Sequence, residues 1–268
     1  MREERRSSEG DGNPSQGDPK GVTAFRTGHG VEVPAATAAQ MREVDRIATD
    51  ETGPNLFQMM ENAGRNLAEL SIELLGEKWN RASVLILAGA GGNGGGGLVA
   101  ARHLANHGAD VRVCLARPDG LEEVPRWQRR VLRSTSAREI SPSDLQGADL
   151  VIDALLGYGM HGPPHGAEAE LITWVNGSGS HVLSLDVPSG VDATTGEAPG
   201  AHVAPRWTMT LALPKTGLRS NLTGDLLLAD IGIPAEVYRR LGLHYRTPFA
   251  GSYRVPIAAC GQRGARRL

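Results

Sequence analysis

Short apolar segments alternate with amphipathic segments along most of this chain of 268 residues. The apolar segments have the length of strands and lie at 83–89, 111–116, 149–157, 181–190, 207–215 and 226–234. Segments with helical spacing lie before and between them, at 37–53, 56–76, 98–107, 121–134 and 166–176. Strands that alternate with helices form parallel sheets whose two faces are both covered. The sequence therefore predicts a doubly wound α/β fold with a mostly parallel sheet.

The two ends of the chain lack this pattern. Residues 1–36 are rich in Gly, Ser and charged residues and show no periodicity, which predicts a disordered tail. A shorter tail is expected over 246–268, which ends in the basic sequence GQRGARRL. We therefore expect one ordered domain at 37–245.

Composition excludes several classes of function. The net charge is −2, so no overall field attracts nucleic acid or an anionic membrane. No apolar run approaches the length of a membrane span, and the first residues lack the apolar core of a secretory signal. With Cys114 and Cys260 as its only cysteines, the chain has no disulfide framework, and we expect a cytoplasmic protein.

Seven glycines fall between positions 89 and 97, directly after a predicted strand. Gly89, Gly91 and Gly94 satisfy the dinucleotide-binding pattern G-x-G-x-x-G, and no Lys-Ser or Lys-Thr follows that would make the loop a Walker A motif. The second strand is followed by Arg117 instead of the carboxylate that usually binds a ribose. Close packing of a helix on a strand explains one or two glycines but not seven, so we favour binding of phosphate or nucleotide by backbone N–H groups.

Two carboxylates end neighbouring predicted strands. Asp153 ends the run LVID, and Asp186 ends VLSLD just before VPSG. A single aspartate there is usually a turn former or helix cap. When two aspartates face one glycine-rich loop, one can instead bind a cation while the other transfers a proton. Ser189 is a candidate cation ligand or turn residue.

The segment 157–166, GYGMHGPPHG, is too rich in Gly and Pro for a helix and is expected to wrap a ligand as a loop. His161 and His165 lie in it, and we expect both to be exposed loop side chains. Lys215, in LPKTGL, is as readily explained by a turn after a strand as by a role near the ligand, so we leave it out of the catalytic set.

These motifs together resemble the YjeF N-terminal domain family, which comprises NAD(P)H-hydrate epimerases. The resemblance runs from about Ala38 to Tyr238 and rests on MREVDRIATDETG…LFQMMENAG, the glycine loop with GLVAARHL, DALLGYGMHGP, LSLDVPSGVDATTG, ALPKTGL and ADIGIP. It implies a Rossmann-like three-layer α/β/α fold and an isomerase that interconverts the R and S epimers of NADHX and NADPHX. It also implies a homodimer, and a functional partner, NAD(P)H-hydrate dehydratase, on a separate chain.

The resemblance implies a role for particular residues. One potassium ion per subunit would be held by Asn93, Asp153 and Ser189. The acid/base residue would be Asp186, which would also contact the substrate beside the nicotinamide ribose. The substrate's phosphates would lie on two stretches of the chain, which are Gly92, Asn93, Gly94, Gly95 and Gly96 in the glycine loop and Gly157, Tyr158, Gly159, Met160, His161, Gly162 and Pro163 in the second loop.

The sequence departs from the family pattern in one place. Residues 92–97 read GNGGGG where the family usually has Asn-Asn-Gly-Gly-Asp-Gly, so Gly92 and Gly96 replace an Asn and an Asp. Losing a hydrogen bond to a charged group costs roughly 1.5–3 kcal/mol, about one to two decades in rate or binding.

Three other functions are alternatives to the epimerase. A weakened family member that only binds nucleotide or another protein keeps the fold without turnover. A nicotinamide-dependent dehydrogenase is disfavoured because the ribose carboxylate and a second substrate domain are missing. A sugar kinase is disfavoured because the loop has no phosphate-anchoring lysine and no separate lid follows.

Overall fold

The structure is a computed structural model, which describes residues 21–260. A ten-stranded sheet runs through it in the order β2-β1-β10-β9-β8-β7-β6-β3-β4-β5. The strands are β1 (Ala24–Thr27), β2 (Glu32–Pro34), β3 (Ser83–Ala88), β4 (Asp110–Leu115), β5 (Arg138–Ile140), β6 (Leu150–Ala154), β7 (His181–Leu185), β8 (Trp207–Leu211), β9 (Asp225–Ala229) and β10 (Arg254–Ala259). From β9 to β5 every neighbouring pair is parallel, which confirms the predicted mostly parallel sheet.

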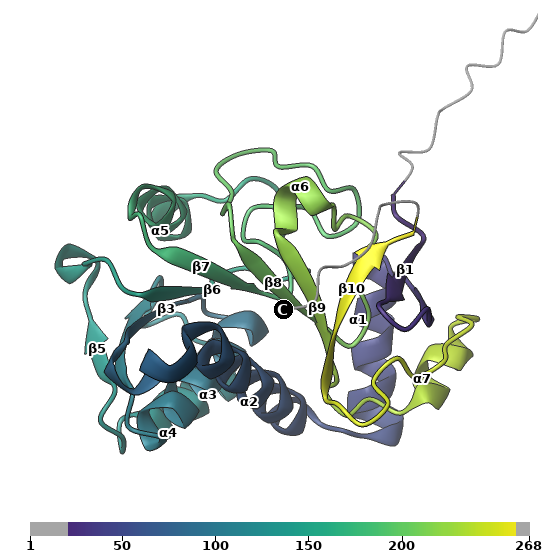
Figure 1. The fold of residues 1–268 in the computed structure, drawn as a ribbon, viewed down its shortest axis with the longest axis horizontal. Coiled ribbons are helices and arrows are strands. Elements are labelled where there is room, and N and C mark those ends of the chain that lie inside the picture. Colours follow the sequence, from purple (N-terminus) through teal and green to yellow (C-terminus); the bar gives the residue numbers. More distant parts are fainter. Residues whose placement is uncertain (1–20, 261–268) are drawn as a thin grey trace, which may run out of the picture.

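Helices cover both faces of this sheet, as Figure 1 shows. They are α1 (Ala38–Ile47), α2 (Leu56–Leu75), α3 (Gly92–Asn106), α4 (Glu123–Leu132), α5 (Gly166–Gly177), α6 (Ser220–Thr223) and α7 (Ala235–Arg240). The apolar side chains of β3 show how the helices pack on both faces of the sheet, because successive side chains of a strand point to opposite faces. Val84 and Ile86 pack with α2 and α3, whereas Leu85 and Leu87 pack with α5. Both faces are therefore buried.

Two helices start at capping boxes that the sequence carries. The Thr37 hydroxyl accepts from the Gln40 backbone N–H at the start of α1, and the Gln40 side chain accepts from the Thr37 N–H. Asn55 and Gln58 form the same reciprocal pair at α2. Each satisfies two backbone donors that a helix start leaves open. None of the described helices combines the length and apolarity that spanning a membrane requires.

The predicted N-terminal tail is wrong for residues 24–36. Residues 24–34 form the hairpin β1–β2, and β1 pairs antiparallel with β10 with Phe25 opposite Ala259. Ala36 makes an isolated bridge with Lys215. The apolar side chains of Phe25 and Val33 are buried against α1 and α7. The strands are short, with four and three residues, so the alternation of apolar and polar residues along them was too brief to be recognised within a polar region. Residues 1–20 of the predicted tail lie outside the described residues.

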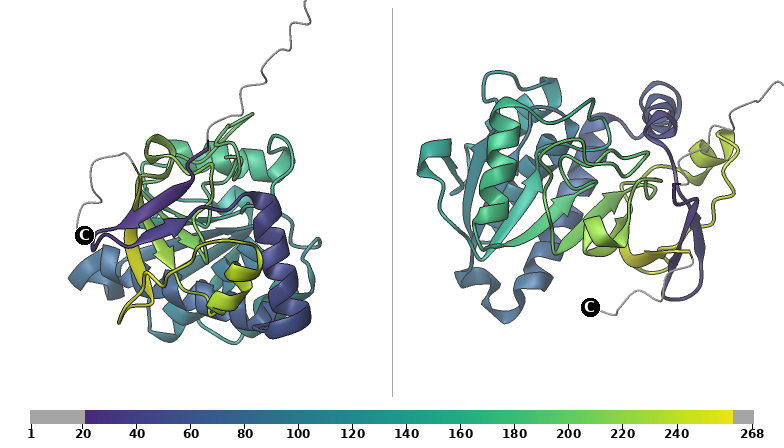
Figure 2. Two further views of the ribbon diagram at one scale, coloured as in Figure 1. Left: turned by 90° about the vertical axis from the view of Figure 1, so that its right-hand side faces the viewer. Right: turned by 90° about the horizontal axis from the view of Figure 1, so that it is seen from above.

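The predicted C-terminal tail needs the same correction. Residues 254–259 form β10, which joins the N-terminal hairpin to β9 by antiparallel pairing. The ordered domain therefore extends beyond the predicted limits of 37–245 at both ends. The view in Figure 2 (left) shows β1, β2 and β10 side by side. Residues 261–268 lie outside the described residues.

The strand order places the switch point of the sheet between β3 and β6. From β3 the chain moves to β4 on one side, and it later returns to β6 on the other. Ligands of doubly wound sheets bind at the carboxyl ends of strands at such a point. Here the loops after β3 and β6 contact each other closely, and the N–H of Gly89 donates to the carbonyl of Ala154 at 3.0 Å.

Candidate active site

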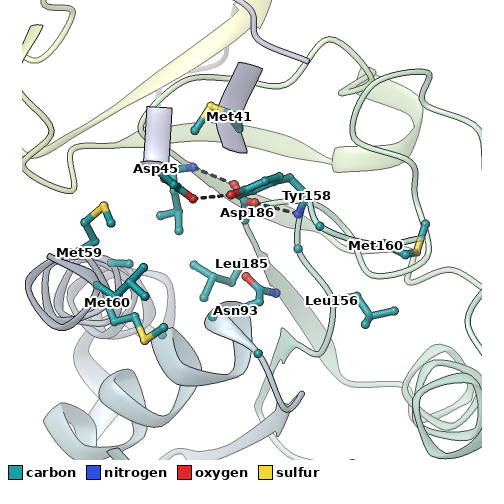
Figure 3. A pocket seen from close by; sticks show the side chains of 18 of the residues that line it. Met41, Asp45, Met59, Met60, Asn93, Leu156, Tyr158, Met160, Leu185 and Asp186 are labelled. Atoms are coloured by element: carbon teal, nitrogen blue, oxygen red, sulfur yellow. Dashed lines mark hydrogen bonds between the residues drawn. The ribbon is translucent and has the colours of Figure 1, made fainter. Parts of the chain in front are cut away.

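A cavity of about 500 Å³ opens at this switch point. It is lined by the start of α3, the loop after β6, the strand ends of β7 and β8, and side chains from α1 and α2 (Figure 3). Three of the segments singled out in the sequence therefore meet in one place. Four methionines contribute to the wall, and they are Met41, Met59, Met60 and Met160.

The glycine run does not form a loop before the helix, because it is the first part of α3 itself. The helix begins at Gly92 instead of residue 98, and Gly91 is its N-cap in extended conformation without any side-chain cap. The first backbone N–H groups of a helix have no partner within it and carry the positive end of its dipole. Gly91, Gly92 and Asn93 line the cavity at this end.

Close packing accounts for more of the glycines than the sequence predicted. A Cβ added at Gly89 or Gly94 would lie 1.9 Å from a backbone oxygen, and one at Gly97 would lie 2.6 Å from the Ala154 side chain. A Cβ at Gly95 would lie 2.5 Å from the sulfur of Met60. Gly94 and Gly95 do not line the cavity. The expectation that packing explains only one or two glycines is therefore wrong.

Gly92 and Gly96, where the sequence departs from the family pattern, are packed differently from each other. A Cβ at Gly92 would meet only the Met60 methyl group, at 3.5 Å. A Cβ at Gly96 would lie 2.9 Å from a terminal methyl of Leu185, and both residues line the cavity. Leu185 thus occupies the space in front of Gly96, so an apolar side chain stands where a longer polar one would project.

Asp186 lies on a strained turn at the end of β7. Its φ is 68°, in the left-handed region that L-residues other than Gly, Asn and Asp rarely adopt. The Val187 N–H donates to the Leu185 carbonyl at 2.9 Å, which closes a γ-turn around Asp186. Strain of this kind costs about 1–3 kcal/mol and gathers at functional sites. The turn directs the carboxylate toward the loop after β6.

The two oxygens of the Asp186 carboxylate have different surroundings. Oδ1 accepts from the ammonium of Lys215, from the Leu211 N–H at 3.3 Å and from the Thr210 hydroxyl at 3.4 Å. Oδ2 accepts from one group, the N–H of Tyr158, at 3.2 Å. Lys215 is completely buried, although its sequence context is equally compatible with an exposed turn. The only hint was a lysine among apolar residues directly after a buried strand.

Tyr158 also connects the site to α1. Its hydroxyl donates to Oδ2 of Asp45, a residue that sequence reasoning missed. Burial raises the pKa of the Asp45 carboxyl above its ordinary value, and the hydrogen bond from Tyr158 only partly offsets this. Burial and the neighbouring Asp45 raise the pKa of the Tyr158 hydroxyl, which therefore stays a donor. A signal existed in the sequence, because Asp45 interrupts the apolar face of Met41, Val44 and Ile47.

The Asn93 amide lies beside Asp186 in the cavity wall. A Cβ added at Gly157 would be 3.3 Å from the Asn93 amide oxygen and 3.3 Å from Oδ2 of Asp186, so both groups flank Gly157. The Asn93 nitrogen is buried and finds no hydrogen-bond partner in the described chain. A buried amide donor without a partner costs about 1–3 kcal/mol, which a ligand that accepts from it would recover.

Asp153 lies beneath the cavity instead of lining it. Its carboxylate is completely buried and accepts from the hydroxyls of Ser184 at 2.7 Å and Ser189 at 2.6 Å. Two backbone N–H groups, of Leu155 and Ser189, complete its shell. Burial raises the pKa of this carboxyl, while these four neutral donors act in the opposite direction. The network joins the loops after β6 and β7.

The predicted site residues of the second loop are divided between the cavity wall and the exposed surface. Gly157, Tyr158, Gly159 and Met160 line the cavity, but His161, Gly162 and Pro163 do not. His161 is exposed and meets the Arg42 guanidinium at 3.3 Å, and His165 is exposed at the start of α5. Arg42 and Arg117 add positive charge to the lining, and Glu122 adds a negative charge next to Gly91.

The comparisons with known proteins agree with this architecture. A family model described as YjeF-related protein N-terminus matches residues 56–217. A protein of Dehalogenimonas lykanthroporepellens named NAD(P)H-hydrate epimerase is 54% identical over 241 residues, which is 89% of this chain and 98% of that protein. The chain belongs to the YjeF-related N-terminal family.

More distant relatives place this domain within longer proteins. A Moorella thermoacetica protein named bifunctional NAD(P)H-hydrate repair enzyme Nnr is 40% identical over 75% of this chain, and the match spans 41% of that protein. The crystal structure of yeast ynu0 superposes with a TM-score of 0.73 at 21% identity and covers 84% of this chain and 100% of the yeast chain. That likeness confirms the fold.

Proposed function

We propose that this protein is an isomerase that interconverts the R and S epimers of NADHX and NADPHX. The observation that carries the proposal is one cavity in which three features meet. These are the uncapped start of α3, the Asp186 carboxylate on its strained turn and the unpartnered Asn93 amide. The relatives named NAD(P)H-hydrate epimerase support the same activity.

The dinucleotide's phosphates fit the start of α3. Backbone N–H groups and the helix dipole favour an anion there, and bare glycine at Gly91 and Gly92 allows its close approach. Arg42 and Arg117 supply positive charge elsewhere in the lining, although Arg117 also pairs with Glu168 at 2.7 Å. The apolar wall built by methionines and leucines suits the apolar part of the hydrated nicotinamide ring.

The reaction needs acid and base in turn at one ring carbon. Asp186 in its acid form gives a proton to the departing hydroxyl, the C–O electron pair leaves with the oxygen as water, and the ring nitrogen's lone pair forms a C=N bond. The resulting carboxylate faces the iminium cation. Water then adds to the opposite face and gives its proton to solvent water, and the Asp186 carboxylate takes up a proton from solvent before the next turnover. Acid/base work of this kind is typically worth 10²–10⁴-fold.

Three oxygen-bearing side chains at the base of the cavity and beneath it would hold a potassium ion. Potassium prefers oxygen ligands, and Asn93, Asp153 and Ser189 offer amide, carboxylate and hydroxyl oxygens. The Asp153 carboxylate is completely buried and has no cationic side chain among its hydrogen-bond partners, so a monovalent cation would compensate its charge. Bound there, the ion would supply positive charge near the substrate's phosphates.

The cellular setting is part of the proposal. On the resemblance alone, we propose that the protein acts beside an NAD(P)H-hydrate dehydratase carried on a separate chain. Both cysteines are free, which supports a reducing compartment such as the cytoplasm. We propose a homodimer as the working assembly, on the resemblance alone.

Replacement of Asp186 by Asn tests the proposed chemistry. Asn tolerates positive φ, so Asp186→Asn keeps the turn while removing the acid/base group. We expect the epimerisation rate, followed by chromatography of the two epimers, to fall by about 10²–10⁴-fold, while binding of NAD(P)H is retained. Asp225→Asn, at an exposed position at the start of β9, is the matched control. Turnover of Asp186→Asn at the wild-type level contradicts the mechanism.

A further inference from the structure

Lys215 is the one described lysine that the fold buries. The chain contains three lysines, at positions 20, 78 and 215, and arginine supplies the other 25 of its 28 cationic side chains. Lys78 is exposed, whereas Lys215 is 0% exposed at the end of the cavity where β8 ends. Burying an ammonium is costly unless its hydrogen bonds and its charge are both satisfied.

All three hydrogens of the Lys215 ammonium have acceptors. The acceptors are Oδ1 of Asp186, the Leu211 carbonyl at 2.8 Å and the Thr210 hydroxyl at 3.3 Å. No proton is left to give to a substrate, so Lys215 is not itself an acid in the reaction. An arginine could not make this set, because its planar fork reaches carboxylates side-on and is larger.

The same contacts make the two oxygens of the Asp186 carboxylate different. Oδ1 is occupied by the ammonium and by donors from Thr210 and Leu211. Oδ2 receives only the Tyr158 N–H and flanks Gly157 opposite the Asn93 amide. Oδ2 is therefore the carboxylate oxygen with room for a further hydrogen-bond partner.

We infer that Lys215 is a positioning residue, which fixes Oδ1 so that Oδ2 alone carries the transferred proton and faces the developing cation. The inference rests on the proposed epimerase function. Geometry of this kind matters because a small misplacement of a catalytic group can cost about 10²-fold in rate.

Lys215→Met tests the inference because it keeps much of the side-chain volume and removes the charge. We expect kcat to fall by roughly 10²-fold, with the KM of the hydrate and the Kd of NAD(P)H within about threefold of wild type. Thr210→Val, which removes the weakest of the contacts to both groups, should lower kcat by a smaller factor. Lys78→Met is the exposed control and should leave kcat unchanged.

A stability measurement separates positioning from a purely structural role. Removing one partner of a buried ion pair destabilises a protein by leaving the other charge uncompensated. Lys215→Met should therefore lower the denaturation midpoint, and the double variant Lys215→Met/Asp186→Asn should recover most of the loss. Failure to recover it would show that Lys215 acts elsewhere than on Asp186, and would overturn the inference.

The outcomes of the kinetic experiment are distinct. A wild-type rate equal to the spontaneous rate overturns both the proposed function and this inference. An active wild type with Lys215→Met at the wild-type kcat overturns the inference alone. If nucleotide affinity falls by the same factor as the rate, the inference is also overturned, because the lysine would then maintain the structure of the whole cavity.

Discussion

At the scale of single residues, the site depends on groups whose surroundings the sequence could not show. Asp186 could be singled out because it ends an apolar run. Lys215 and Asp45 could not, because what defines them is a contact between segments far apart in the chain: 29 residues separate Lys215 from Asp186, and 113 separate Asp45 from Tyr158. The γ-turn at Asp186 could not be predicted from the sequence either, since an aspartate at a strand end is compatible with many turns.

Asp45 makes stability depend on pH. Its pKa is raised, so the folded protein holds a proton there at pH values at which the unfolded chain has lost it. The free energy of unfolding contributed by this group is therefore fully present below the unfolded-state pKa and falls as pH rises through the raised value.

Asp45→Asn should remove this dependence. We expect the unfolding free energy of the variant to increase relative to that of the wild type as pH rises from about 4 to 7. Urea unfolding of both proteins across that range measures it. A difference that is constant with pH, or that moves the other way, would show that Asp45 does not take up a proton on folding.

At the scale of elements, the sequence predicted the alternation of strands and helices well, and the first and last residues of each element less well. The strand at 83–89 and the helix at 166–176 correspond to β3 and α5, because long periodic segments carry strong signals. The start of α3 was misplaced by six residues. Glycine is a poor helix former, so a run of glycines looks like a loop, and only the packing of α3 against β3, β6 and α2 overrides that preference.

Two glycines of α3 test this explanation. Gly97→Ala should destabilise the protein by about 1–3 kcal/mol, because its methyl group would lie 2.6 Å from the Ala154 side chain and overpacking is costly. Gly92→Ala meets only an ordinary contact at 3.5 Å, so better helix propensity should leave stability equal or slightly higher. Thermal unfolding of the two variants compares them. Equal effects at both positions would mean that close packing does not select glycine here.

At the scale of the whole molecule, the two ends of the chain complete one sheet. β1 and β10 pair beyond the parallel strands, and Phe25 lies in a cluster with side chains of α1, α7 and β9. The sequence could not reveal this pairing, because the partners lie more than 200 residues apart and each strand is short.

Phe25→Ala tests whether the N-terminal hairpin belongs to the folded domain. Phe25 is 1% exposed, so its truncation should cost about 3–5 kcal/mol, as expected for a buried aromatic ring. Arg26→Ala, on the opposite face of the same strand, should change stability by no more than about 0.5 kcal/mol. An unchanged denaturation midpoint for Phe25→Ala would restore the hypothesis of a tail.

The measurement that tests the central claim most directly is the conversion of the R epimer of NADHX to the S epimer by the purified protein in potassium buffer. It is followed by chromatography beside the spontaneous reaction, because the epimers also interconvert unaided. We predict clear acceleration over the spontaneous rate, despite glycine at positions 92 and 96. A rate equal to the spontaneous one, with the protein folded and still binding nucleotide, would contradict the account and identify a binding module on an epimerase fold.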